Sequence, residues 1–317
     1  MSNHTPNTVG IDISKAHLDA HEWPSHRAAR FANDAAGIQR LAEWIGAPVQ
    51  CVIYESTGPW HRALEDALAD TLPLACVNAL RARRFAQAMG QQAKTDAVDA
   101  RVLAAMGAAI PPRQVTPRSA TRRDLHELQT AREALIKDRT AALNRQKHAR
   151  HPLLKRQLKN RLAQIRRQLQ ALDEETATLI GADETLARQA QVLVSIPGIA
   201  SVTAAGLLAE MPELGRIDAK AAASLAGLAP VTRESGQYKG RASIRGGRAR
   251  LRKILYMAAV SASRHNPDLA RKYADLRARG KPPKVALTAV MRKLLVLANA
   301  LLKQDRTWTP NHAAATA

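Results

Sequence analysis

Four acidic residues occupy positions where their carboxylates can do chemistry together. Asp12 lies in one apolar segment, Glu55 ends another, and Asp96 and Asp99 stand three residues apart at the start of a predicted helix. The last two therefore share one helical face. Four carboxylates in one pocket repel one another unless divalent cations neutralise them, and oxygen ligands of this kind suit Mg²⁺ or Mn²⁺. Two such ions would hold a phosphodiester and stabilise its entering and leaving oxygens.

Each of these acids also has an ordinary structural explanation. Asp12 fits a surface acid at a strand end, and Glu55 fits a cap for the turn that follows it. Asp96 and Asp99 fit the positive end of a helix dipole, with Thr95 as the capping residue. The order of the four acids, ahead of a basic region, favours the metal site, although their spacing alone leaves both explanations open.

Positive charge is concentrated behind the acids. The chain of 317 residues has 48 Lys and Arg against 27 Asp and Glu, a formal net charge of +21. Residues 1–110 hold 10 basic and 11 acidic residues, so nearly all of the excess lies beyond them. This asymmetry indicates a polyanionic partner, and nucleic acid is favoured over a merely solvated surface.

The elements that must position the acids follow an alternating pattern. Asn33 or Asp34 caps the first predicted helix and Thr95 the last. Alternating strands and helices predict an α/β domain with a central sheet, at whose edge strand-end carboxylates can converge. The predicted strands are 8–13, 17–23, 27–32, 50–54 and 74–77. The predicted helices are 34–45, 59–70, 80–89 and 96–106.

Beyond the prolines of residues 111–117 the pattern predicts helices alone. A seam of Leu158, Leu162, Ile165, Leu169 and Leu172 has heptad spacing, which fits a coiled-coil hairpin or dimer contact and equally an internal bundle. Residues 192–210 resemble a helix-hairpin-helix whose turn presents N–H groups to a phosphate, an ordinary helical turn being the alternative. Apolar helices are predicted near 254–262 and 284–302, so the C-terminal domain is expected to be all-α.

Composition excludes several classes of protein. Aromatic residues are only 3%, so base stacking is not the main mode of binding. Cys51 and Cys76 are the only cysteines, each in an apolar run, which excludes a zinc finger and predicts two core thiols. The first residues lack a signal-peptide layout, and no apolar run approaches the ~20 residues of a membrane span. A cytoplasmic protein is expected.

Taken as they stand, these motifs resemble the DEDD transposases of the bacterial IS110 group, which are related to the Piv DNA invertases. The resemblance covers roughly residues 8 to 303, and small departures at Ser56, the Gly58-Pro59-Trp60 run and Ala200 leave the acids and the serine untouched. It is carried by GIDISK (10–15), YESTG (54–58), KTDAVDAR (94–101), SIPGI (195–199), LAGLAP (225–230), RESG (233–236) and LRKILYM (251–257).

The resemblance implies a fold, a reaction and partners. Residues 1–110 would be a RuvC-like, RNase H-type α/β domain whose metal-binding acids are Asp12, Glu55, Asp96 and Asp99. Residues 111–190 would be the linker and coiled-coil helices, and 191–317 the helical transposase domain. Ser235 would attack DNA and form a covalent phosphoserine. The protein would act as a homo-oligomer supported by the coiled coil, with an active site composed of residues from both domains. Some members are guided by a structured noncoding RNA that pairs with donor and target DNA.

Arginine suits phosphate recognition through its bidentate fork, and the serine lies in a basic stretch. The residues expected to contact phosphates are Arg233, Lys239, Arg241, Arg245, Arg248, Arg250 and Arg252.

Other functions remain open from the residues alone. Without the resemblance, Ser235 is an ordinary turn serine, and a RuvC-like nuclease could cut DNA junctions with water and the four acids. A basic scaffold with an inactive acidic domain is a non-enzymatic alternative. Tyr256 is a further candidate nucleophile, but its apolar helix favours a role in the core. Transposition and inversion are not distinguished, nor are a dimer and a tetramer.

Overall fold

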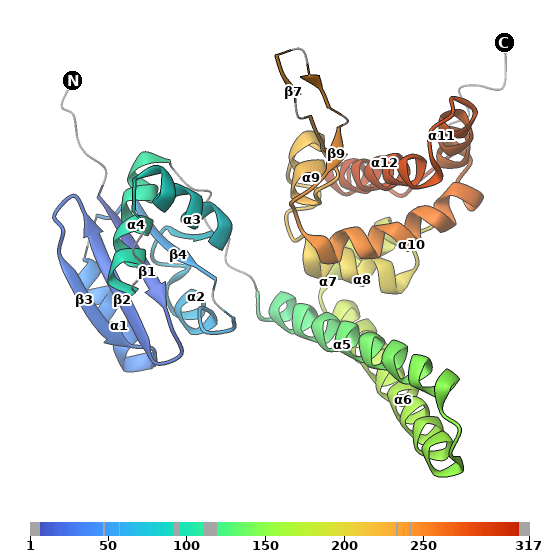
Figure 1. The fold of residues 1–317 in the computed structure, drawn as a ribbon, viewed down its shortest axis with the longest axis horizontal. Helices are drawn as coiled ribbons and strands as arrows, with labels where there is room; N and C mark the ends of the chain where they lie inside the picture. Colours follow the sequence, from blue (N-terminus) through green and yellow to red (C-terminus); the bar gives the residue numbers. More distant parts are fainter. Residues whose placement is uncertain are drawn as a thin grey trace. The chain divides into compact units, whose positions relative to one another are not determined.

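In the computed structural model, the residues described are 7–46, 48–56, 58–91, 96–110, 119–232, 234–236, 238–240 and 242–310, with the backbone alone at 96–97 and 238–239. The chain divides into two compact units, Met1–Arg118 and Ser119–Ala317. Figure 1 draws the first, here called the N-terminal unit, in blue and teal, and the second, the C-terminal unit, in green through red.

The N-terminal unit contains a five-stranded sheet in the order β3-β2-β1-β4-β5. Strands β1, β2 and β3 form an antiparallel meander, whereas β4 and β5 run parallel to β1. The predicted strands are confirmed to within a residue at each end. Their bounds are β1 Thr8–Ile13, β2 His17–Trp23, β3 Ala28–Ala32, β4 Cys51–Glu55 and β5 Leu74–Val77.

Helices cover both faces of this sheet. Alternate residues of β1 such as Val9 and Ile11 pack with α1 and α2, whereas Ile53 of β4 packs on the other face with α3 and α4. Asp34 caps α1 by accepting from the Gly37 N–H, as predicted. The predicted cap Thr95 lies outside the described residues. The helices are α1 Ala35–Ile45, α2 Arg62–Leu68, α3 Ala79–Ala88 and α4 Asp96–Ala109.

The C-terminal unit consists mainly of helices, beginning with the long antiparallel pair α5 and α6. Leu158, Leu162, Ile165, Leu169 and Leu172 of α6 are all half-buried or buried, so the predicted seam is on the side that is covered. The remaining helices enclose a single core to which α8, α10 and α12 contribute most. Their bounds are α5 Ala120–His148, α6 Pro152–Ala182, α7 Glu184–Val194, α8 Ser201–Glu210, α9 Ala219–Leu225, α10 Ala249–His265, α11 Pro267–Ala278 and α12 Pro283–Lys303.

The C-terminal unit is not all-α, which corrects the expectation from the sequence. Two short ladders join four strands of two residues each into a ribbon over residues 230–244, here called the serine ribbon. This stretch is rich in glycine and polar residues, so it offers no apolar helical face to bury. Its strands are β6 Pro230–Val231, β7 Glu234–Ser235, β8 Tyr238–Lys239 and β9 Ser243–Ile244.

Three other expectations were wrong. Cys51 is buried, but Cys76 is exposed on the edge strand β5. Tyr256 is 40% exposed on α10 rather than packed in the core. Within the described residues, α12 is long and apolar enough to span a membrane by length and composition alone, whereas no apolar run of that length was expected. Its fully buried Leu294, Leu295 and Leu301 make α12 a core helix of this unit.

Candidate active site

Asp12 and Glu55 lie side by side at the carboxyl ends of two parallel strands. The register of β1 and β4 pairs Ile11 with Tyr54, and each acid is the next residue along its strand. Ile11 and Tyr54 both face α1 and α2. Because side chains alternate along a strand, the two acids point to the other face, which α3 and α4 cover.

Helix α4 crosses that face directly on β1, because Gly10 leaves room for its backbone. A Cβ at Gly10 would collide with the Ala100 carbonyl oxygen and the Ala104 nitrogen. One step earlier on the strand, the Thr8 hydroxyl donates to the Ala104 carbonyl oxygen at 2.7 Å. The helix and strand therefore run in opposite directions, in close contact.

This packing places the start of α4 near Asp12. Two residues of a strand advance about 6.6 Å, and four residues of a helix advance about 6 Å. Moving two residues forward along β1, from Thr8 to Gly10 or from Gly10 to Asp12, therefore corresponds to moving about one turn toward the start of α4. Since Ala104 lies at Thr8 and Ala100 at Gly10, the level of Asp12 corresponds to the first turn of α4, which holds Asp96 and Asp99. Asp99 is partly buried there, and the side chain of Asp96 is outside the described set.

The four predicted acids thus come to one edge of the sheet, from three different elements. Their carboxylates are the hard oxygen donors that Mg²⁺ and Mn²⁺ take. Among the side chains that the structure describes, which lack Asp96, no three His, Cys, Asp or Glu side chains are gathered tightly enough to hold an ion. The backbone brings the acids to this edge, and the fourth member of the donor set is the one not described.

Two loops beside the acids are fastened to each other, which the sequence did not reveal. The side-chain amide of Asn33 donates to the carbonyl oxygens of Ser14 at 2.8 Å and Trp60 at 3.1 Å. Lys15 extends over the Trp60 ring, 5.7 Å from its centroid. The loops that follow β1 and β4, the strands carrying Asp12 and Glu55, are therefore held together. No local motif marks Asn33, because its partners are 19 and 27 residues away.

The opposite face of β4 carries a buried polar group. The Tyr54 hydroxyl donates to the Glu65 carboxylate of α2, and its ring stacks on that of His61 at 6.2 Å between centroids. Burial, with the neighbouring Glu65 carboxylate, raises the pKa of Tyr54 far above its usual value. Tyr54 therefore stays neutral and anchors α2 beneath the strand that carries Glu55.

Ser235 lies at the outer end of the serine ribbon. It ends β7, pairs with Tyr238 of β8 and is solvent-exposed. Gly236 next to it has a φ of 55°, a left-handed conformation that glycine adopts without strain. Figure 1 shows the ribbon extending from α9, with β9 near its base and β7 at its far end. The hydroxyl is thus presented to solvent with no bulky residue following it.

The base of the serine ribbon is held by arginines of α10 and its cap. Arg248 forms a bidentate pair with Glu213, at 2.8 and 2.6 Å, and donates to the Glu210 carbonyl oxygen at 2.8 Å. Hydrogen bonding to Glu213 raises the pKa of Arg248 further, so its charge is permanent. Arg252 donates to the carbonyl oxygens of Ala226 and Gly246, which joins the two ends of the ribbon.

Glycines allow those ends to meet. A Cβ on Gly247 would collide with the backbone of Gly227, and the Arg248 N–H donates to the Leu225 carbonyl oxygen at 2.8 Å. Both glycines have positive φ, at 61° and 65°. The backbone before and after the ribbon is therefore in direct contact.

Family comparisons identify both units. A transposase model of the IS110 type matches residues 9–151, and the model of the "Transposase IS116/IS110/IS902 family" matches residues 190–274. The pilin gene-inverting proteins of Moraxella bovis and Moraxella lacunata are each 31% identical, over 94% of this chain and 96% of theirs. An IS110 protein of 43.6 kDa from Streptomyces coelicolor is 31% identical over 46% of this chain and 36% of its own.

The chain belongs to the IS110 family of DNA transposases and recombinases. The family resemblance and the enzyme class that the sequence predicted are thereby confirmed. The family also implies an active site that depends on a divalent metal and DNA as the partner.

In this transposase, three of the seven residues expected to meet phosphates have partners inside the protein. Besides Arg248 and Arg252, Arg250 pairs with Glu133 of α5 and, at 3.2 Å, with Glu210. Burial alone would raise the pKa of Glu133, but hydrogen bonds from Arg250 and Lys253 outweigh it and lower the pKa to about 2. These arginines join α10 to its neighbours. Arg245 is exposed, and Arg233, Arg241 and the side chain of Lys239 fall outside the described residues.

The predicted helix-hairpin-helix is a close helix–turn–helix formed by α7 and α8. Gly198 in its turn has a φ of 106°, and a Cβ there would collide with the backbone and side chain of Ala262 on α10. Ile196 and Ile199 of the same turn are buried. The glycine thus serves the packing of the turn against α10, and a phosphate contact by this turn stays a prediction.

Proposed function

We propose that this transposase cuts and rejoins DNA through a covalent phosphoserine at Ser235, assisted by Mg²⁺ or Mn²⁺ bound to Asp12, Glu55, Asp96 and Asp99. The observation that carries the serine is its exposed position at the end of a ribbon whose base is pinned by Arg248 and Arg252. An exposed serine on an anchored support is suited to meet a DNA backbone.

The acidic edge supports the metal part of the proposal. Asp12 and Glu55 share a face at adjacent strand ends, and α4 lies across that face with its acidic first turn at their level. The strand order, with an antiparallel meander followed by two parallel strands, supports a RuvC-like, RNase H-type assignment for the N-terminal unit. When bound, the metal would lower the pKa of an attacking hydroxyl and neutralise phosphate charge.

The chemistry of the serine step conserves the phosphodiester. The Ser235 Oγ bonds to phosphorus, the bond from phosphorus to one deoxyribose oxygen breaks, and the serine proton ends on the released hydroxyl. Attack by the hydroxyl of another DNA end reverses these changes, frees Ser235 and seals the new strand. No external energy source is needed, because one phosphate ester replaces another.

Contacts with substrate would come from basic residues in and next to the serine ribbon. Arg233, Lys239, Arg241 and Arg245 are proposed to bind DNA phosphates, whereas Arg248, Arg250 and Arg252 support them through their internal pairs. We propose further that the protein acts in the bacterial cytoplasm as a homo-oligomer on donor and target DNA, with a structured noncoding guide RNA. The similarity to pilin gene-inverting proteins over most of the chain favours inversion as one of its reactions.

The test is a covalent adduct between the protein and DNA that flanks its own gene. The protein is co-expressed with that DNA and its transcripts and supplied with Mg²⁺. The sample is then denatured, and adducts are resolved on gels. The wild type should give an adduct that Ser235→Ala abolishes and Tyr256→Phe leaves intact. Tyr256 is a useful control because its hydroxyl belongs to an exposed side chain of the same unit.

Three other outcomes would reject the proposal. Cleavage without any adduct, equal in wild type and Ser235→Ala, would leave a nuclease that uses water. An adduct lost only in Tyr256→Phe would identify a tyrosine recombinase. DNA binding that is indifferent to Asp12→Asn, with no cleavage in Mg²⁺ or Mn²⁺, would leave a scaffold without catalytic activity.

A further inference from the structure

The far half of the α5–α6 hairpin has an unusual charge composition. Residues 139–172, here called the distal hairpin, comprise the end of α5, the connecting turn and the first two-thirds of α6. They contain ten Lys and Arg residues and no Asp or Glu. All ten basic residues are solvent-exposed: Arg139, Arg145, Lys147, Arg150, Lys155, Arg156, Lys159, Arg161, Arg166 and Arg167.

Most of these charges do not stabilise the hairpin, although Arg145 and Lys147 lie in the last turn of α5, where cations favour the helix dipole. Within this hairpin, which the structure describes throughout, Arg161 makes the only ion pair of the ten, with Asp138 at 3.6 Å. Lys155, Arg156 and Lys159 lie near the N-terminus of α6, whose first turn holds no acid. Cations at that end oppose the helix dipole. A surface that accumulates unpaired cations against the dipole is better explained by a negative partner.

The cations of α6 form a stripe. At 100° per residue, Lys155, Lys159 and Arg166 fall within about 40° of one another, and Arg156 and Arg167 lie about 80–100° round the helix from their centre, so all five occupy roughly one third of its circumference. The covered leucine seam adjoins Lys155, Lys159 and Arg166, with its centre about 80° round the helix from theirs. From Lys155 to Arg167 the stripe runs about 18 Å along the helix axis, enough to follow several phosphates of a duplex.

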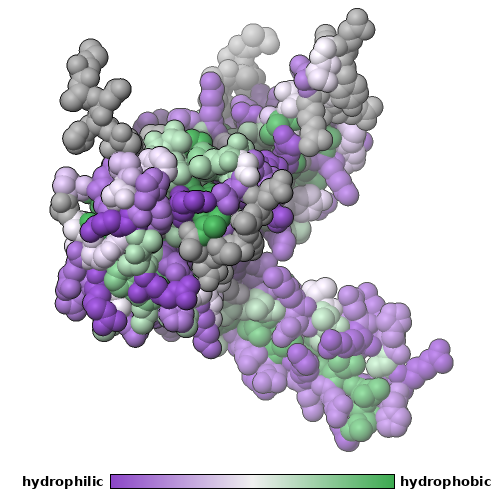
Figure 2. All heavy atoms as spheres, turned by 60° about the vertical axis from the view of Figure 1, so that its left-hand side comes forward, coloured by the Kyte–Doolittle hydropathy of each residue, from purple (hydrophilic) through white to green (hydrophobic). Residues whose placement is uncertain are grey.

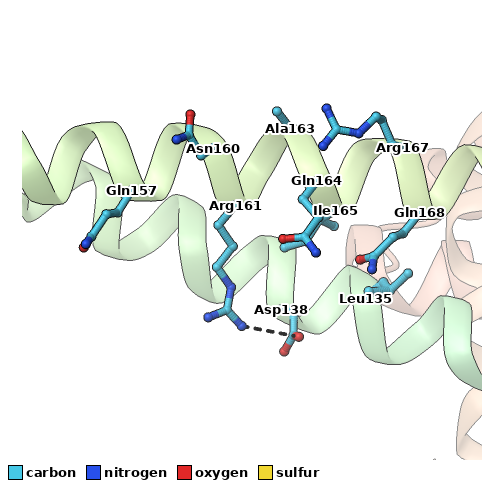
Figure 3. Close-up of a pocket in the computed structure, with 10 residues that line it drawn as sticks. All are labelled: Leu135, Asp138, Gln157, Asn160, Arg161, Ala163, Gln164, Ile165, Arg167 and Gln168. Atoms are coloured by element: carbon cyan, nitrogen blue, oxygen red, sulfur yellow. Dashed lines mark ion pairs between the residues drawn. The ribbon is translucent and has the colours of Figure 1, made fainter.

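Amide side chains lie on the side of α6 opposite Lys155, Lys159 and Arg166. An open groove along α6 is lined by Gln157, Asn160, Gln164 and Gln168 together with Arg161 and Arg167. Figure 3 shows Arg161 reaching toward Asp138 on α5, and Asn160 and Arg167 on the other side of α6. Figure 2 shows hydrophilic side chains along the edges of the hairpin and hydrophobic ones between its helices. Amides and guanidinium groups both donate hydrogen bonds to phosphate oxygens.

We propose that the distal hairpin binds the sugar–phosphate backbone of duplex DNA, as a contact separate from the serine ribbon. The proposal rests on the proposed function only for the identity of the polyanion, since DNA is the partner that the family implies. A second copy of the chain is the less suitable occupant. Two surfaces with ten positive and no negative charges repel each other, despite the exposed Leu153 and Leu154 nearby.

The test compares two variants that remove the same charge from different places. The first replaces Lys155, Lys159, Arg166 and Arg167 by Gln. The matched control replaces Arg279, Lys281, Lys284 and Lys293 by Gln; these are also exposed, without an ion pair among the described residues, and lie on or next to α11 and α12. Both are made in a Ser235→Ala background, so that binding is measured without reaction, and both are checked for unchanged helicity and melting.

Binding to a duplex of about 40 base pairs is measured by fluorescence anisotropy over a series of salt concentrations. Each neutralised phosphate contributes about −0.9 to the slope of log K against log salt, so the slope of the distal variant should be shallower by roughly 3 to 4. Its affinity near 0.1 M salt should fall about 8-fold for each phosphate that is no longer neutralised. The control should keep the wild-type slope.

Several results would overturn the proposal. An equally shallow slope in both variants would mean that only total charge matters, and an unchanged slope would mean that the distal hairpin does not touch DNA. A weakened affinity for an RNA duplex with DNA binding intact would assign the surface to RNA. A changed sedimentation coefficient with the DNA slope intact would assign it to a second copy. Failure of the serine mechanism alone would leave these binding results unaffected.

Discussion

Replacing Gly10 by Ala should separate α4 from the sheet and displace half of the acidic site. The added Cβ would lie 2.9 Å from the Leu103 Cβ and closer still to backbone atoms of Ala100 and Ala104. Carbon atoms prefer about 3.5–4.0 Å, and a backbone obstacle cannot rotate away, so α4 must retreat by about 1 Å. Overpacking of this kind costs about 3 kcal/mol of unfolding free energy.

The same displacement should reduce catalysis, because Asp96 and Asp99 move with α4 while Asp12 stays on β1. A misplacement of about 1 Å lowers a rate roughly 100-fold. Gly107→Ala is the matched control on the same helix. Its added Cβ would meet only side-chain atoms of Ile53 and Thr8, at 3.3 and 3.5 Å, so the free energy should change by less than about 1 kcal/mol.

Stability of the N-terminal unit can be followed by tryptophan fluorescence during unfolding in urea. Trp23, Trp44 and Trp60 belong to this unit, so a Trp308→Phe background makes the signal specific. Adduct formation reports on activity. If Gly10→Ala unfolded at the same urea concentration as Gly107→Ala and kept full activity, the close contact between β1 and α4 would be refuted.

Three further predictions concern the C-terminal unit and the metal. Because the pKa of Glu133 is lowered from 4.5 to about 2, its stabilising effect is complete above pH 5 and is lost as the pH falls toward 2. Arg250→Gln should therefore reduce the loss of unfolding free energy between pH 5 and pH 2, by about 3 kcal/mol at most. An acid dependence of the unfolding free energy equal to that of the wild type would contradict the pairing. Glu213→Gln should lower the free energy of unfolding by about 2 kcal/mol, because it weakens the bidentate pair with Arg248. It should also slow adduct formation by loosening the serine ribbon. A rate of adduct formation equal to that of the wild type would show that this pair does not contribute to catalysis. Chelation of divalent ions should abolish adducts until Mg²⁺ or Mn²⁺ is restored, whereas Asp12→Asn should respond to neither ion; activity that survives chelation would exclude a metal site.

The sequence by itself determined the elements of the N-terminal unit and led to the hypothesis of a metal site at its acids. Strand periodicity over residues 8–13 and 17–23 and the cap at Asp34 are local features, because alternation and capping depend only on neighbouring residues. Charge asymmetry and the motifs around Asp12 and Ser235 likewise needed no coordinates. The family followed from them and was confirmed by comparison.

The serine region was predicted less well, because short strands depend on their partners. The ladder between β6 and β9 joins residues 12 or more positions apart, and each strand has only two residues. No periodicity can show in so short a segment. The exposure of Tyr256 was missed for a related reason: an apolar neighbourhood in the sequence does not say which side of a helix the core will cover.

Only the tertiary structure decided which charged groups serve the fold and which face solvent. Arg248 and Arg245 look alike in the sequence, yet one meets Glu213, 35 residues away, and the other is exposed. Gly10 proved to be the contact that brings α4 across β1, and the adjacency of Asp12 and Glu55 required the parallel register of their strands. These outcomes depend on residues far apart in the chain, whose meeting is fixed by burial of the shared core rather than by local preference.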